Sequence, residues 1–384
     1  MKRPLLIVII LLVIILAFPA FSFFKWAFQD KKPMNILVLN KTVPTLDRAT
    51  HRSLFWIFNN ERFVKKDKKR SYSYRKDYYG FYPLKPMREY QHKMVDYRLA
   101  ELIDIAESTD ALYFADTYGV FYSEWYNTVS RTRRTRKIRG GLNNNDQKLL
   151  TEMYKREKLI VLEYNSFDYP TADLEKYKVE EQLGIKSSGW TAKYFSSLDS
   201  VDNKELPLWM LSMYRKYYNR PWSYSKPGVV FVKNREIVVL EEGTHLVNPL
   251  PFIITSDEYV TRYGIEGKVP FTNWFEYIDP IGNEIVSTFK LETTAEGDSL
   301  LDVSFLTAEF PAVIVDTLNH RNFYFTGDFA TNDISYATSF FASHSLLKKS
   351  FFSEKDVNDP RRFFWLYYKP LINSIFTEYY NTIK

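Results

Sequence analysis

The sequence of 384 residues contains no cysteine, and this absence excludes several kinds of site at once. Without a thiol there is no disulfide, no thiolate metal ligand, no iron–sulfur cluster and no cysteine nucleophile. Histidine is scarce, with five residues, and none of them forms the HxH, HxxxH or HExxH spacing of a zinc site. The sequence therefore predicts no metal site and no cofactor.

The motifs of common enzyme classes are missing as well. There is no GxSxG elbow of a serine hydrolase and no Walker-type or GxGxxG phosphate loop. Apolar residues make up 45% and charged residues 26% of the chain, which excludes global disorder. Whether the chain is an enzyme stays open, and a non-catalytic role is favoured.

The N-terminal residues 1–24 have the pattern of a targeting segment. Lys2 and Arg3 precede an uncharged, mostly apolar stretch over residues 5–24, long enough as a helix to span about 30 Å, the hydrocarbon thickness of a bilayer. The pattern predicts one N-terminal transmembrane helix that anchors the chain in the cell membrane. The alternative is a signal peptide cleaved near Ala20-Phe21-Ser22. Both place the body outside the cytoplasm, with the lipid bilayer as a partner.

Short apolar runs alternate with helical periodicity in the first half of the body. The runs at residues 35–40, 111–116 and 159–163 predict buried strands, and helices are expected near 45–59, 91–108, 144–157 and 171–183. This alternation predicts an α/β fold with a mostly parallel, flavodoxin-like sheet flanked by helices.

The second half predicts additions to that sheet. After a helix near 205–218 we expect a hairpin over 228–232 and 236–240, strands at 252–256, 312–315 and 323–325, and closing helices at 333–350 and 360–382. Residues 285–292 fit no single pattern. The expected organisation is a linker at 25–34, one α/β body over 36–330 with a basic excursion at 60–90, and a C-terminal helical cap over 331–384.

The order of elements resembles a known family. A strand, a helix and a second strand lead to Gly140-Gly141-Leu142, a polar helix start and residues 158–165. This order is similar to the class I glutamine-amidotransferase-like fold, most of all its non-catalytic versions in membrane-associated bacterial proteins. The resemblance covers residues 36–245. Catalytic members carry a cysteine flanked by glycines on an elbow after the third strand, where this chain has Glu163-Tyr164-Asn165-Ser166. The resemblance therefore implies the architecture and a pocket, without amidotransfer chemistry.

Three carboxylates follow predicted strands. Asp116 and Glu163 end consecutive parallel strands, at the edge where open α/β sheets bind ligands, and Asp328 follows a late strand. Such carboxylates can bond sugar hydroxyls, hold a cation or act as acid and base, which makes all three catalytic candidates. The alternative is that each carboxylate caps a helix or bonds loop amides. The predicted ligand-binding residues are Asp116, Tyr118, Glu163, Tyr164, Asn165 and Asp328.

Positive charge is concentrated in two segments. Residues 62–98 hold twelve Lys or Arg against four Asp or Glu, and a second run occupies residues 131–139. Either these are solvated loops, or they bind an anionic partner such as lipid head groups, an acidic glycan or a phosphorylated carrier lipid. Nucleic acid would fit the charge but not the inferred compartment. The predicted anion-binding residues are Arg131, Arg133, Arg134, Arg136, Lys137 and Arg139.

Two functions follow from these patterns. The first is a membrane-anchored, extracytoplasmic, non-catalytic binding or accessory protein, serving assembly or export of a cell-surface polysaccharide, with an envelope glycan or a membrane protein complex as partner. The alternative is an extracytoplasmic hydrolase that uses carboxylates on a glycan or an ester.

Overall fold

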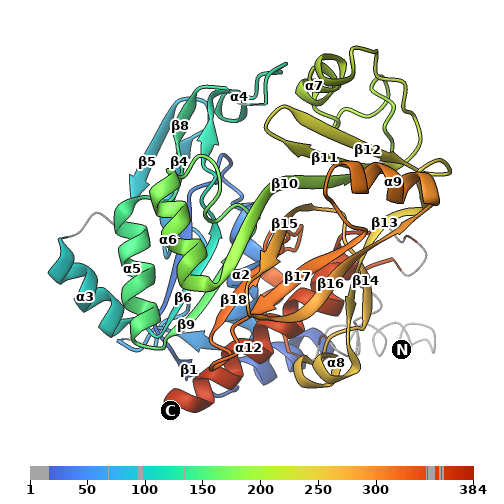
Figure 1. The fold of residues 1–384 in the computed structure, drawn as a ribbon. Helices are drawn as coiled ribbons and strands as arrows, with labels where there is room; N and C mark the ends of the chain where they lie inside the picture. The colour runs from blue at the N-terminus through green and yellow to red at the C-terminus, as the bar shows by residue number, and fades with distance from the viewer. Residues whose placement is uncertain are drawn as a thin grey trace, which may run out of the picture.

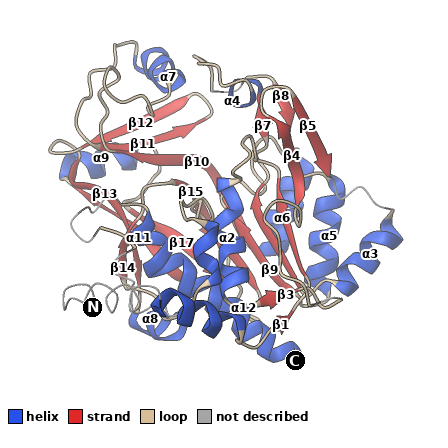
Figure 2. Cartoon of the chain, turned by 180° about the vertical axis from the view of Figure 1, so that it is seen from behind, coloured by secondary structure: helices blue, strands red, loops and turns tan. Residues whose placement is uncertain are grey.

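The computed structural model of the protein is built around two β-sheets (Figures 1 and 2). The larger sheet has ten strands and the smaller has four, and helices cover them. The structure describes residues 17–67, 69–93, 98–133, 135–342, 344, 351–353, 356 and 359–384.

The ten-stranded sheet joins segments from the whole length of the chain. Its strands, in spatial order, are β14 (Lys268–Pro270), β13 (Leu246–Thr255), β16 (Glu284–Thr293), β17 (Glu309–Val315), β18 (Asn322–Phe325), β9 (Leu159–Glu163), β6 (Ala111–Asp116), β2 (Ile36–Asn40), β4 (Tyr79–Lys85) and β5 (Glu89–Lys93). The pairs from β18 to β4 are parallel, and the other pairs are antiparallel.

The prediction of a mostly parallel sheet is therefore wrong, and with it the amidotransferase-like resemblance as a description of this fold. In the described chain, four neighbouring pairs of this sheet are parallel and five are antiparallel, and the four-stranded sheet is antiparallel throughout. The physical reason is that the hairpins after residue 245 extend the same sheet. The parallel half alone matches the prediction.

The parallel half separates two cores. Ile36 and Val38 of β2 face one core, whereas Leu37 and Leu39 face the other, and β6 and β9 alternate in the same way. The first core packs against α2 (Ala49–Asn60) and α12 (Lys369–Ile383). The second packs against α3 (Leu99–Ser108), α5 (Asn144–Lys155) and α6 (Asp173–Leu183), which lie on the opposite face (Figures 1 and 2).

The four-stranded sheet also has two apolar faces. It runs in the order β12 (Glu236–Glu241), β11 (Gly228–Lys233), β10 (Ile185–Phe195) and β15 (Trp274–Pro280). Val229 and Phe231 of β11 join the first core, while Val230 and Val232 pack under α7 (Leu208–Tyr218). This sheet therefore lies between the antiparallel half of the large sheet and α7.

The remaining elements are short. They are β1 (Lys32–Pro33) paired with β3 (Phe63–Val64), β7 (Val120–Phe121) paired with β8 (Lys137–Arg139), α4 (Tyr122–Trp125), α8 (Asp257–Tyr263), α9 (Ala295–Val303), the 3₁₀ turn η1 (Tyr336–Phe340), α11 (Arg361–Phe363) and the π-helical turn η3 (Phe364–Tyr368). The helix expected over 91–108 is in part the edge strand β5, and residues 285–292 belong to β16.

No helix among the described residues combines the length and the apolar character that crossing a bilayer requires. The prediction of a single-pass anchor, and of the membrane and extracytoplasmic location that depended on it, is corrected accordingly. Residues 1–16 of the predicted segment lie outside the described residues. Its end is part of the folded body, because the buried Ser22 hydroxyl donates to the Ala342 carbonyl oxygen at 2.5 Å. Directly after the segment, the Trp26 ring nitrogen donates to the Asn59 carbonyl oxygen at 3.0 Å.

Candidate functional site

Parallel strands bring the three predicted carboxylates to one edge of the large sheet. Glu163 ends β9, Asp116 ends the neighbouring β6, and Asp328 follows β18 on the other side of β9. Asp328 lies near enough for its negative charge to raise the pKa of both other carboxyls. The structure therefore brings these residues together. Whether they contact a ligand stays a prediction.

Glu163 is fully buried and bonded on both carboxylate oxygens. Its Oε2 accepts the backbone N–H groups of Phe329 and Ala330 at 3.1 and 2.9 Å. Its Oε1 accepts the hydroxyls of Tyr113 and Tyr368, the latter at 3.3 Å. Burial raises the pKa of Glu163 well above its usual range, although these hydrogen bonds oppose the rise. These contacts tie the strand, the loop after β18 and the C-terminal helices together.

Asp116 and Asp328 lie in similar surroundings. Burial raises the pKa of Asp116 well above its usual range, although the Thr42 hydroxyl and the Tyr118 N–H, 2.7 Å from Oδ1, oppose the rise. Burial raises the pKa of Asp328 to about 6, against hydrogen bonds from Thr331. Burial therefore favours the protonated form of both carboxyls.

A cleft opens beside this cluster, and we call it the edge cleft. Its volume is about 340 Å³, and it lies between the loops after β6 and β9, the start of α6, and β10. Of the predicted ligand-binding residues, Tyr118 and Asn165 line it, whereas Tyr164 is buried behind it, where burial raises the pKa of its phenol well above the usual value. Asn165 adopts the left-handed region with φ 61°, which asparagine tolerates better than most residues.

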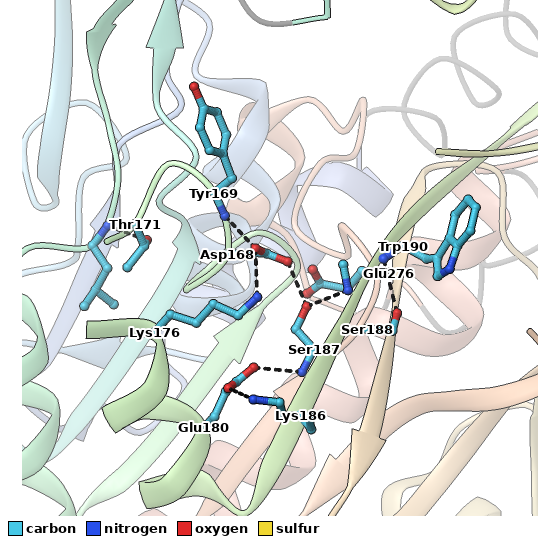
Figure 3. Close-up of polar contacts among 12 residues, drawn as sticks. Asp168, Tyr169, Thr171, Lys176, Glu180, Lys186, Ser187, Ser188, Trp190 and Glu276 are labelled. Carbon is cyan, nitrogen blue, oxygen red and sulfur yellow. Dashed lines mark hydrogen bonds and ion pairs between the residues drawn. The ribbon is translucent and has the colours of Figure 1, made fainter. Parts of the chain in front are cut away.

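Asp168 is the charged centre of the edge cleft. Its Oδ1 accepts the Lys176 ammonium at 3.0 Å and the Tyr169 N–H at 2.8 Å, and its Oδ2 accepts the Ser187 hydroxyl at 2.8 Å (Figure 3). Burial raises the pKa of Asp168, but Lys176, Ser187 and Tyr169 outweigh it and hold that pKa below its usual range. Asp168 is therefore ionised and fixed in orientation at neutral pH.

A bulge in β10 shapes the opposite wall. The pairing of β10 with β15 shifts register between Ser187 and Thr191, and Gly189 in between has φ 78°. The N–H of Gly189 donates to the Ser187 hydroxyl oxygen at 3.1 Å, and that hydroxyl donates to Asp168 (Figure 3). The bulge therefore aims the serine at the carboxylate.

Glu276 of β15 lies next to this cluster (Figure 3). It is 2% exposed, and its Oε1 accepts the Tyr324 hydroxyl. Burial raises the pKa of Glu276 to about 8 against that hydrogen bond, and the charge of Asp168 adds to the rise. A carboxyl that keeps its proton at neutral pH thus lies buried near the ionised Asp168, although Glu276 is not one of the residues that line the cleft.

Sequence reasoning missed Asp168, Lys176, Ser187 and Glu276. Asp168 offered a signal, because it follows the end of β9 by only a few residues. Glu276 offered none, because it belongs to a strand of the other sheet. The described residues include no group of three or more His, Asp or Glu side chains arranged to hold a metal ion.

The predicted anion-binding residues divide between two places. Arg131 lines hollows beside α7. Arg133 lines the edge cleft, where its Nη2 donates to the Thr191 hydroxyl at 3.0 Å, and also one of the hollows beside α7. Lys137 and Arg139 are exposed at the ends of β8, next to the exposed Arg136. Arg134 lies outside the described residues.

No protein-family model matches the sequence, and no curated protein matches it. Two solved structures that match are β-galactosidases. That from Bacillus circulans sp. alkalophilus shares 8% identity, with 78% of this chain and 30% of that chain covered and a TM-score of 0.33. That from Rahnella sp. R3 shares 8% identity, with 83% and 31% covered and a TM-score of 0.34. This chain spans under a third of either structure.

Proposed function

We propose that the protein binds a carbohydrate in the edge cleft. The observation that carries this proposal is the ionised, oriented Asp168, with Lys176 beside it and Asn165 on the same loop, all three lining the cleft. A carboxylate accepts hydrogen bonds from sugar hydroxyls, and an amide can both donate and accept them. A volume of about 340 Å³ lies at the small end of the range for ligand sites.

Two tyrosine rings support the same ligand class. Tyr118 and Tyr169 line the cleft with their ring centroids 6.3 Å apart, and Tyr169 also stacks near the buried Phe121. Aromatic rings with polar tips suit the apolar faces of sugars. The aromatic side and the charged side of the cleft together match a ligand with alternating apolar faces and hydroxyl edges.

Binding can be tested with defined probes. We expect an array of neutral and acidic oligosaccharides to contain at least one that binds, with affinity measured by isothermal titration calorimetry. Asp168→Asn should weaken that binding about tenfold or more, because a charged hydrogen-bond acceptor is lost. Asp302→Asn, the same change on the exposed side of α9, is the matched control and should leave binding unchanged. Binding that is equal in all three proteins would exclude the edge cleft.

One observation favours hydrolysis of the bound carbohydrate as a second candidate. Asp168 and Glu276 have pKa values that their environments move in opposite directions, as the base and acid of a glycosidase require. In that case the natural protein releases reducing ends with many turnovers, and Glu276→Gln abolishes release while binding remains. Binding without turnover supports the binding function alone. Participation of Asp116, Glu163 or Asp328, and a role in polysaccharide assembly or export, stay predictions.

A further inference from the structure

We infer that the carbohydrate is an acidic polymer, which runs from the edge cleft along a basic groove beside α7. The inference rests on the proposed function, because it takes the edge cleft as one end of the binding track. It adds the length and the charge of the ligand.

Three hollows follow one another across this side of the molecule. The edge cleft shares Arg133 and Asn234 with a hollow of about 1060 Å³ between the basic loop and α7. That hollow shares Arg131 and Ser212 with another of about 740 Å³ that is also lined by α7. Figure 1 shows α7 beyond the hairpin of β11 and β12. A single sugar would occupy only a small part of it.

The two hollows beside α7, which we call the basic groove, carry an excess of positive charge. Arg131, Lys216 and Arg235 line the middle hollow, where Glu236 is the only acidic residue among the described lining residues. Arg215 joins Arg131 in the outer hollow. All four cations are exposed, and none makes a salt bridge within the described part of the chain. Their charge is therefore available to an anionic ligand.

Fixed aromatic and guanidinium groups accompany this charge. Arg220 donates its Nε–H to the Tyr214 hydroxyl at 2.7 Å, which holds the guanidinium at the rim of the outer hollow. Trp222 is held by a hydrogen bond from its ring nitrogen to the Leu198 carbonyl oxygen at 2.8 Å. Trp209 lines the middle hollow with the Arg133 guanidinium 5.6 Å from its ring centroid. The basic groove thus offers both charge and flat apolar faces.

The edge cleft decides which polyanion fits. Lys176 lies 3.0 Å from Asp168 and offsets its charge, so the carboxylate at the end of the track acts as a fixed acceptor of hydrogen bonds from hydroxyls. An acidic polysaccharide has both hydroxyls for the cleft and carboxylates or sulfates for the groove. A DNA strand would satisfy the groove but carries no hydroxyls along its backbone to donate to Asp168.

The test compares polygalacturonate, alginate and chondroitin sulfate with neutral dextran, by calorimetry at two salt concentrations. We expect at least one acidic polymer to bind more tightly than dextran, with an affinity that falls as salt rises. The double variant Arg131→Gln, Arg235→Gln should weaken that binding about five- to tenfold, while Arg70→Gln, Arg88→Gln removes the same charge from exposed residues elsewhere and should not.

The outcomes separate the two proposals. If no carbohydrate binds, the proposed function fails. If carbohydrates bind in a manner that depends on Asp168 but the groove variant equals the control, the proposed function stands and the acidic polymer is refuted. If oligothymidylate binds more tightly than every acidic polysaccharide, and Asp168→Asn strengthens that binding, the groove serves a nucleic acid and the inference is wrong.

Discussion

Replacement of Glu163 tests whether this carboxyl group is structural. In Glu163→Ala the N–H groups of Phe329 and Ala330 lose their buried acceptor. Each buried donor left without a partner costs about 1–3 kcal/mol, so the two cost about 4 kcal/mol together. The Tyr113 and Tyr368 hydroxyls, 3.0 Å apart, would still bond each other.

Glu163→Gln provides the isosteric control. Because burial raises the pKa of Glu163 and favours its neutral form, the amide is a close mimic. Its oxygen can accept the two backbone N–H groups while its nitrogen donates to the tyrosine oxygens. We therefore expect a loss below about 1.5 kcal/mol in the free energy of unfolding.

The assay is urea unfolding, combined with amide hydrogen exchange over residues 361–383. Exchange there should quicken in Glu163→Ala, because the carboxyl group links β9 to Tyr368 of η3, directly before α12. A structural role of Glu163 is refuted if the free energy of unfolding of Glu163→Ala lies within about 1 kcal/mol of that of the natural protein. If Glu163→Ala kept its stability but lost carbohydrate binding, Glu163 would be a ligand contact.

Three further predictions concern stability. The pKa of Glu276 is about 8 in the folded protein, above its usual 4.5. The free energy of unfolding should therefore fall as pH rises from 4.5 to 8, by up to about 1.4 kcal/mol per pH unit. In urea unfolding at several pH values, Glu276→Gln should remove this slope, and equal slopes in the two proteins would contradict the prediction. Gly80→Ala should cost more than about 2 kcal/mol, because the added Cβ would lie 1.7 Å from the Asn40 carbonyl oxygen. Gly282→Ala, where φ is positive but the space is open, should cost about 1 kcal/mol. Similar melting temperatures for the two variants would contradict this difference. Lys41→Met removes the ammonium that lies 2.5 Å from Oδ2 of the buried Asp146 and leaves the Asn143 N–H, at 2.8 Å, as the donor to that oxygen. The loss of the buried ion pair should cost about 3–5 kcal/mol by urea unfolding, unless Asp146 is changed to Asn as well.

The sequence could predict strands that are buried on both faces. The run of β9, like those of β2 and β6, is apolar at every position up to its last residue, because each strand faces one core with even positions and the other with odd ones. The hairpin of β11 and β12 was predicted for the same reason.

Strands at the edges and in the antiparallel half were harder to predict. β13 contains Pro249 and Pro251, which obscure its pattern, and β16 alternates buried positions with polar ones around a register shift. No local pattern predicts that these strands belong to the same sheet as β9, which they join through β18. The fold class was therefore wrong although many of its elements were placed correctly.

The candidate site depends on pairings that the sequence does not encode locally. Asp116 and Glu163 could be placed at one edge because parallel strands end together. Glu276 lies near Asp168 because β15 pairs with β10, and Ser187 is aimed at the carboxylate by a bulge. The charge run at 131–139 was visible, but not that its first residues face α7.

Protection of the edge cleft from hydrogen exchange would show directly that a carbohydrate binds there. Hydrogen exchange can be followed with and without a saturating concentration of the tightest-binding probe from the oligosaccharide array. If the carbohydrate binds in the edge cleft, we expect slower exchange in residues 165–176 and 186–191, which form the two walls around Asp168. This protection should be lost in Asp168→Asn. Protection confined to other parts of the chain, with these two segments unchanged, would contradict it.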